Sequence, residues 1–220
     1  MKKKLLNLIN LCFIPVLFVI ILWVIKGVEI NTETNFSHLG LIAKNTSSVI
    51  NILTFPLIHG GNVDPSLISY KDFEHLINNS FPIMLLGSII STIYKEISNQ
   101  VFFFSYLFSG GILWFIGNPN ENVIGASGLV FSLASFIVVS GFIRKSPRLS
   151  MLSFLIIFIY GNSLFWGMIP MPNDVSWEGH LAGFIAGTIL SIIYKNKGPK
   201  EKKYDWEIEE ENTKNLDFQS

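Results

Sequence analysis

The sequence predicts an all-α membrane protein whose six transmembrane helices form a bundle with both termini in the cytoplasm. Three observations support this fold class. Only 15% of the 220 residues are charged, against about 25% in a typical soluble domain. The apolar residues gather in six segments, most of them near the ~20 residues that a helix needs to cross a bilayer. The basic residues collect on one side of the topology that these segments imply.

The six expected spans are joined by short polar connections, except for one long connection after the first. They lie at about Leu5–Ile25, Phe73–Ile93, Asn99–Gly117, Val123–Ile143, Leu149–Ile169 and Gly179–Tyr194. The first follows three lysines, as the core of a signal peptide would. Its apolar run exceeds the ~7–15 residues of such a core and ends without a small-residue cleavage site, so we expect a retained helix.

The second and sixth segments are the least uniformly apolar. The first ten residues of the second include Glu74, His75, Asn78, Asn79 and Pro82, whereas the sixth is short and rich in glycine. Polar groups inside a span are costly and usually face a protein interior or a water-filled cavity. We therefore expect the second segment to direct these side chains away from lipid.

The distribution of positive charge sets the orientation, because cytoplasmic loops are enriched in Lys and Arg. With the amino terminus inside, the inner segments hold thirteen of the 16 basic residues, and the outer segments hold only Lys26, Lys44 and Lys71. Six spans with both termini inside fit this bias. Short termini and Ile-, Asn- and Lys-rich usage favour a bacterial cell membrane.

Two regions are expected outside the spans. Residues 1–195 form the membrane domain, and residues 196–220 form a charged cytoplasmic tail that we expect to be disordered. The outer segment Gly27–Asp72 is long for a connection within a compact domain. Its apolar part, Val49–Ile58, is expected to rest on the membrane surface or to form a partial structural element.

The composition also excludes several classes of function. A net charge of zero argues against a globally basic nucleic-acid-binding protein. A single cysteine, Cys12, allows no internal disulfide and no cysteine-based zinc site. The four histidines have no HExxH-like spacing, so we expect no metal and no other cofactor. Nothing in the sequence specifies an oligomeric state.

Ser127 lies in the fourth span, within Gly125-Ala126-Ser127-Gly128. Gly and Ser are common where membrane helices approach closely, so this motif alone indicates packing. It also differs from the GxSxG elbow of soluble hydrolases, because Leu129 stands two residues after the serine.

The sixth span gives Ser127 a second interpretation. His180, Gly183 and Gly187 share one helix face, and a histidine inside a span is by default a functional candidate. If this face meets the small residues of the fourth span, His180 can reach Ser127. Histidine is the usual base that activates a serine nucleophile.

The second span supplies two further polar groups at a similar depth. His75 and Asn79 are four residues apart and share a face. Both can donate hydrogen bonds, as stabilisation of an acyl-transfer oxyanion requires. Because the second, fourth and sixth spans run in the same direction, we expect all four polar residues roughly 5–10 Å below the outer surface.

The three motifs together resemble those of the rhomboid intramembrane serine proteases. The match consists of HxxxN in the second span, GxSG in the fourth and HxxGxxxG in the sixth, and it extends over about Leu5–Tyr194. Ile52–His59 also resembles the segment that leads into the second span of the family, although the interval from His59 to His75 is longer here.

The resemblance implies a rhomboid-like bundle and a serine endopeptidase with a Ser–His dyad that cleaves single-span membrane proteins near the outer face of the bilayer. Ser127 would be the nucleophile and His180 the general base, with His75, Asn79 and the backbone N–H of Ser127 stabilising the oxyanion. Gly125, Gly128, Phe131, Gly183 and Gly187 would pack around the site. The substrates and the lipid bilayer would be the partners, and the outer loop Met171–Glu178 a candidate gate.

Two positions depart from the family pattern. Phe131 stands where many bacterial members have a tyrosine that stacks on the histidine, which keeps the ring and removes the hydroxyl. The Trp-Arg pair common in the first loop of the family is missing, which leaves open how this loop is anchored.

Two other functions are consistent with parts of the sequence. A catalytically silent rhomboid-like protein could bind membrane helices without cleaving them. A transporter or channel would place ionisable groups near the middle of the membrane or use paired broken helices, whereas here the polar set lies near one surface.

Overall fold

The computed structural model describes residues 12–171 and 176–199, and within them the protein is helical. Six long helices are present: α2 (Phe13–Asn31), α3 (Lys71–Ile93), α4 (Ser98–Ile116), α5 (Ser127–Ile143), α6 (Pro147–Gly167) and α7 (Trp177–Ile193). Three short 3₁₀ helices precede α3: η1 (Ser37–Leu39), η2 (Thr46–Leu53) and η3 (Phe55–Leu57). The expected tail lies largely outside the described residues.

Four of the long helices, α2, α3, α4 and α6, have the length and composition to cross a membrane. The other two, α5 and α7, are apolar but have 17 residues each, a length of roughly 25 Å against a hydrocarbon core of ~30 Å. The fold is therefore a helical bundle with four candidate spans. The count of six spans and the side on which the termini lie stay predictions.

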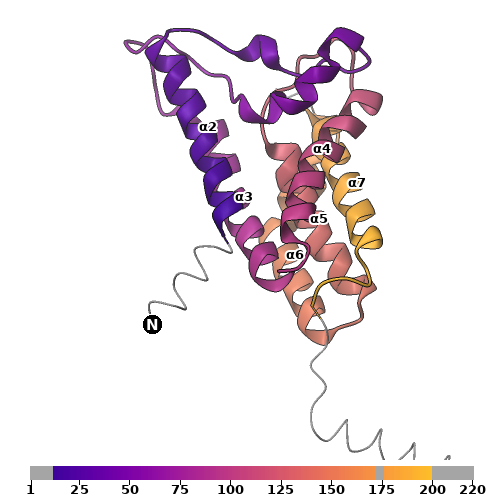
Figure 1. Cartoon of the computed structure of the whole chain (residues 1–220). Coiled ribbons are helices and arrows are strands. Elements are labelled where there is room, and N and C mark those ends of the chain that lie inside the picture. Colours follow the sequence, from indigo (N-terminus) through magenta and orange to yellow (C-terminus); the bar gives the residue numbers. More distant parts are fainter. Residues whose placement is uncertain (1–11, 172–175, 200–220) are drawn as a thin grey trace, which may run out of the picture.

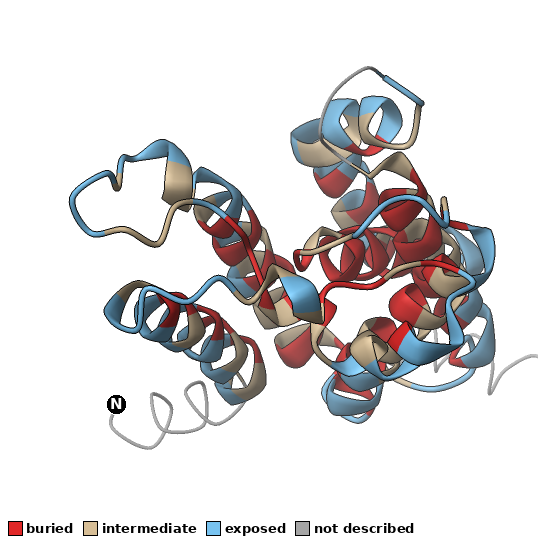
Figure 2. Ribbon diagram, turned by 90° about the horizontal axis from the view of Figure 1, so that it is seen from above, coloured by how far each residue is buried: buried red, intermediate tan, exposed pale blue. Residues whose placement is uncertain are grey.

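The centre of the bundle is α5, of which twelve of 17 residues are buried. It packs against α3, α4, α6 and α7, whereas α2 lies at the edge of the bundle beside α3 (Figure 1). Buried residues line the faces where helices meet, and exposed residues cover the outside (Figure 2). α6 is mostly exposed, in contrast to α5. Of its 21 residues the buried ones are Leu149, Ser153, Ile156 and Leu164.

Two helix boundaries within the described residues differ from the prediction by more than two residues. The first helix extends to Asn31, beyond the expected end at Ile25, because Lys26 and Glu29 form a buried ion pair at 3.9 Å that lets both charges stay in the helix. The fourth helix begins at Ser127, four residues later than expected. Val123 is instead paired with Leu41 in an isolated antiparallel bridge.

The long connection after α2 crosses the end of the bundle at which the expected outer loops lie (Figure 1). Its apolar part forms η2 and η3. Side chains of α4 hold it in place: the Tyr106 hydroxyl donates to the Leu53 carbonyl at 2.5 Å, and Trp114 Nε1 donates to the Asn45 carbonyl at 3.0 Å. These contacts anchor the loop although the Trp-Arg pair is missing.

A second anchor comes from α2. Lys26 Nζ donates to the carbonyls of Gly60 and Asn62, at 2.7 and 3.2 Å. The Glu29 carboxylate accepts from the Phe36 backbone N–H at 2.8 Å. The ion pair thus ties both ends of the long connection to the first helix, which the sequence pattern did not indicate.

Backbone approach between α5 and α7 depends on glycine. A Cβ atom added at Gly183 would overlap the Gly128 carbonyl oxygen, and one added at Gly187 would overlap the Ser132 carbonyl oxygen. Such close contact is typical of small residues between membrane helices. The contact brings the amino-terminal ends of both helices together.

We expect Gly187→Val to separate α5 from α7. Overpacking a tight contact costs about 1–3 kcal/mol, which corresponds to a fall in melting temperature of roughly 2–12 °C for a chain of this size. Measurement of the melting temperature of both proteins in detergent tests this expectation. Gly111→Val is the matched control, because a Cβ at Gly111 on α4 meets nothing within 4 Å; equal losses in both variants would contradict the packing role.

Candidate active site

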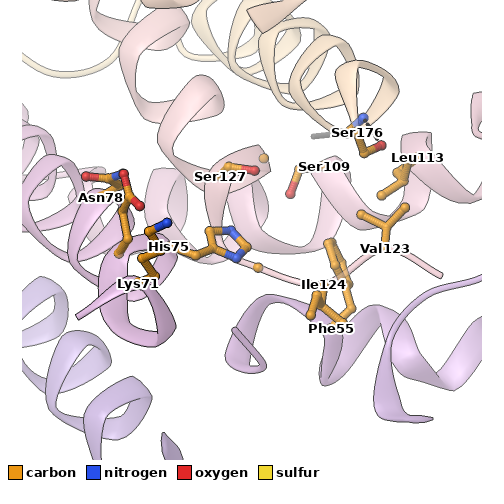
Figure 3. Close-up of a pocket in the computed structure, with 14 residues that line it drawn as sticks. Phe55, Lys71, His75, Asn78, Ser109, Leu113, Val123, Ile124, Ser127 and Ser176 are labelled. Atoms are coloured by element: carbon orange, nitrogen blue, oxygen red, sulfur yellow. Dashed lines mark hydrogen bonds between the residues drawn. The ribbon is translucent and has the colours of Figure 1, made fainter. Parts of the chain in front are cut away.

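A cavity of about 490 Å³ opens beneath the long loop, at the end of the bundle where α3, α4, α5 and α7 converge. Figure 3 shows His75, Ser109 and Ser127 around it, contributed by three different helices. Its walls combine polar and apolar side chains with glycine backbone. The lining residues are Phe55, Lys71, Glu74, His75, Asn78, Ser109, Leu113, Val123, Ile124, Gly125, Ser127, Gly128, Ser176 and Gly179.

Ser127 is the first residue of α5 and is half-buried in the cavity wall. The preceding turn contains Gly125, whose φ of +105° lies in the region that favours glycine. A Cβ there would lie 2.5 Å from the His75 ring. The backbone N–H of Gly125 donates to the Phe55 carbonyl at 2.9 Å. The loop before α3 therefore holds the turn that presents Ser127.

His180 is the fourth residue of α7 and is 7% exposed. Its Nδ1 lies 2.9 Å from the Gly167 carbonyl oxygen. Because a carbonyl can only accept, Nδ1 carries the proton and Nε2 is left with a lone pair. The imidazole also stacks on the Phe131 ring, with centroids 4.0 Å apart and planes at 7°.

The stacking of His180 on Phe131 places the imidazole on the side of α5 that carries Ser127. Phe131 and Ser127 are four residues apart on α5, so they share a helix face, and His180 lies against that face. No hydrogen bond joins the Ser127 hydroxyl to His180 within the described part of the chain. Catalytic hydrogen bonds are often long in the absence of substrate and tighten when it binds.

His75 and Asn79 both adjoin Gly125 but differ in exposure. His75 is exposed and lines the cavity, whereas Asn79 is 4% exposed and lies behind the wall. Asn79 Nδ2 donates to the His75 carbonyl at 3.1 Å, which leaves its second N–H available. A Cβ at Gly125 would lie 3.7 Å from this nitrogen. The pair thus meets the turn before Ser127.

His59 joins the site although eleven residues separate it from the start of α3. Asp72 closes this segment into a loop, because its carboxylate accepts hydrogen bonds from the backbone N–H groups of Asn62 and Ser69 at 2.7 and 2.8 Å. The His59 ring consequently packs edge-on against His75, with centroids 5.1 Å apart. The longer interval in the sequence therefore leaves the two histidines adjacent.

Sequence reasoning missed Ser109 and Leu113. Both lie on α4, one turn apart, and both line the cavity. Ser105 and Ser109 form a small buried pair at i and i+4, and this spacing could have indicated a helix face directed inward. Glu178, at the end of the expected outer loop, is 8% exposed. Part of the expected gate Met171–Glu178 lies outside the described residues.

The described residues contain no group of three or more His, Cys, Asp or Glu side chains that could hold a metal ion. The chemistry available at the cavity is that of a hydroxyl, imidazoles, amides and backbone N–H groups. These can attack a carbonyl, move a proton and stabilise an oxyanion.

Burial, together with the nearby His75, lowers the pKa of His59 to about 3. Its Nε2 is buried and has no hydrogen-bond partner among the described residues, so a second ring proton would be unsatisfied. His59 is therefore neutral in the folded protein at neutral pH. The unfolded chain would protonate it near its ordinary pKa of ~6.5.

The pH dependence of stability follows from this difference. As the pH falls below ~6.5, His59 becomes protonated in the unfolded chain but stays neutral in the folded protein. The contribution of neutral His59 to the free energy of unfolding is therefore fully present above pH ~6.5 and declines as the pH falls toward ~3. Between pH 7.5 and 5.0 the free energy of unfolding of wild type should fall by up to ~2 kcal/mol more than that of His59→Asn. Chemical denaturation at both pH values measures the difference. Parallel losses in the two proteins would assign the effect to other groups.

Comparison with known proteins supports a family assignment. A family model described as the Rhomboid domain matches residues 65–197. An uncharacterized protein of Mycobacterium leprae (strain TN) is 26% identical over 185 residues, which cover 80% of this chain and 68% of the relative. Uncharacterized proteins of Mycobacterium bovis and Mycobacterium tuberculosis are each 26% identical over 186 residues, with 80% of this chain and 72% of the relative covered.

Proposed function

Since the chain belongs to the rhomboid family, we propose that it is an intramembrane serine endopeptidase that cleaves single-span membrane proteins near the outer face of the bilayer. The observation that supports this function best is the environment of His180. Its Nδ1 is engaged by the Gly167 carbonyl, and its ring is stacked on Phe131, one turn beyond Ser127. This arrangement presents an imidazole with a fixed tautomer to the helix face that carries the serine.

In the proposed reaction, Nε2 of His180 accepts the proton of the Ser127 hydroxyl as the oxygen attacks the scissile carbonyl. The resulting tetrahedral intermediate carries a negative charge on the former carbonyl oxygen. The N–H groups of His75 and Asn79 and the Ser127 backbone N–H stabilise that charge. The imidazolium then protonates the leaving amine, and the peptide C–N bond breaks to leave an acyl ester on Ser127.

Water completes the cycle. His180 removes a proton from a water molecule as the water oxygen attacks the ester, which gives a second tetrahedral intermediate. When this intermediate collapses, the C–O bond to Ser127 breaks and the imidazolium returns its proton to the serine oxygen, which releases the carboxylic acid and the free serine. The open cavity beside Ser127 and exposed His75 supports access of this water from the solvent side. Glycine at Gly125 lets the His75 ring approach the turn before Ser127, because a Cβ there would lie 2.5 Å from that ring.

The substrate must expose a carbonyl before attack. A helical peptide uses its carbonyls in internal hydrogen bonds, so a segment of low helical stability near the outer membrane surface is the proposed target. By family resemblance, we propose that the cleaved bond follows a small residue. Among the described residues, Lys71 and Glu74 are the charged side chains that line the cavity, and their opposite charges accord with a mainly uncharged substrate segment.

We expect Ser127→Ala and His180→Ala each to lower the rate of cleavage by at least ~10³-fold, because nucleophile and base act as a unit. The assay is gel analysis of tagged single-span substrates in liposomes. Ser132→Ala is the matched control, since its buried hydroxyl on α5 has no hydrogen-bond partner among the described residues.

Two outcomes would contradict this assignment. Cleavage by Ser127→Ala at the wild-type rate would exclude this serine as the nucleophile. Stable binding of substrate helices by folded wild type, without product across the panel, would favour the catalytically silent binding protein.

Asn79→Ala tests the oxyanion role separately. Loss of one oxyanion donor lowers kcat by about 10²–10³-fold, and KM should change little because the charge exists only in the transition state. Steady-state kinetics separate the two constants. Asn99→Ala, at the other end of the bundle, is the control; a rise in KM at unchanged kcat in Asn79→Ala would instead assign Asn79 to substrate binding.

A further inference from the structure

A second polar cavity is lined by residues of the α5–α6 connection and of the segment that follows α7. These segments lie at the end of the bundle opposite the long loop (Figure 1). The volume of this cavity is about 260 Å³. Arg144, Ser146, Lys195 and Asn196 supply its polar wall, and Ile143 and Leu149 are among its apolar residues. The proposed peptidase activity uses none of these residues. We refer to it as the Arg144 pocket.

Arg144 is held rigidly at this pocket. Its Nε donates to the Ser140 hydroxyl at 2.9 Å, and its Nη2 donates to the carbonyls of Tyr194 and Lys197. The guanidinium also lies over the Tyr94 ring, 5.5 Å from its centroid. Its Nη1 makes no hydrogen bond within the described residues. The clamp therefore fixes the cation and leaves two N–H donors for a ligand.

The basic side chains around the Arg144 pocket form no ion pair with a carboxylate among the described residues. Arg144 joins two basic segments, one with Lys145 and Arg148 and the other with Lys195 and Lys197, because it binds the carbonyls at the end of α7. The described residues contain one ion pair, Lys26–Glu29, which lies at the other end of the molecule. The Arg144 pocket thus combines two cationic side chains with further hydrogen-bond donors, and none of its described lining residues is acidic.

The setting of the pocket indicates an amphipathic ligand. Ile143 is 37% exposed, and the neighbouring Phe142 and Phe154 are 45% and 61% exposed and pack edge to face with centroids 5.4 Å apart. This aromatic pair continues the apolar outer surface of α6, on which Met151 and Phe158 are 73% and 88% exposed. A ligand bound here would meet cations at one end and a lipid-facing apolar surface at the other.

We propose that the Arg144 pocket binds the headgroup of an anionic glycerophospholipid. The phosphodiester accepts hydrogen bonds from Arg144 Nη1 and from Lys195, and Ser146 and Asn196 supply neutral polar contacts. The acyl chains lie along the exposed apolar surface beside Phe142. Basic residues near a membrane surface attract anionic lipids, and a preformed cavity with a clamped arginine adds geometric selectivity to that attraction.

The test is native mass spectrometry of the full-length chain, released from mixed micelles that contain phosphatidylglycerol and phosphatidylcholine. Wild type should retain phosphatidylglycerol in preference to phosphatidylcholine. Lys195→Gln should weaken the retained binding by about fivefold, and Lys195→Arg should restore it. Lys95→Gln removes the same charge at the same end of the bundle but outside the Arg144 pocket, so it should change binding less than twofold.

Three results would overturn the proposal. Equal retention of the two lipids would exclude a headgroup site. Equal losses of phosphatidylglycerol binding in Lys195→Gln and Lys95→Gln, with both proteins shown to be folded by circular dichroism, would attribute the binding to general surface charge. Displacement of phosphatidylglycerol by millimolar inorganic phosphate would identify a site for small anions instead of a lipid.

Discussion

The close contact of α5 with α7 is the constraint on which the rest of the structure depends. Gly183 and Gly187 let α7 approach until its backbone touches the carbonyls of Gly128 and Ser132. In a membrane the hydrophobic effect does little to hold helices together, so such contact must supply packing directly. The same contact sets His180 against Phe131. Stability and the proposed chemistry therefore share a single interface, and a change that loosens one alters the other.

The first loop adds a second level of support from outside the bundle. Leu41 pairs with Val123, and the Phe55 carbonyl accepts from Gly125, so the loop holds the extended segment that leads into Ser127. Lys26 and Tyr106 in turn hold the loop. A chain of contacts thus runs from the edge helix α2 to the serine, although α2 contributes no residue to the cavity.

Much of this arrangement follows from the sequence, since apolar runs and glycine spacing are local properties. The six long helices and the meeting of the small faces around Gly128 and Gly183 could be predicted in this way. The end of α2 could not, because Lys26 and Glu29 terminate an apolar run yet neutralise each other within the helix. The start of α5 was also misplaced, since the pairing of Val123 with Leu41 joins residues more than eighty positions apart. Ser109 was missed because its inward direction depends on which face of α4 meets α5.

The shortness of α5 and α7 has a consequence for biogenesis. Helices of 17 residues are shorter than the ~20 residues that span a bilayer, so the stable placement of α5 and α7 in the membrane depends on the longer helices that surround them. Among the described helices α7 is the last along the chain, and it carries His180. A nascent chain that has not yet reached α7 contains Ser127 but lacks the proposed base, so the proposed catalytic pair forms only once α7 has been made and packed against α5.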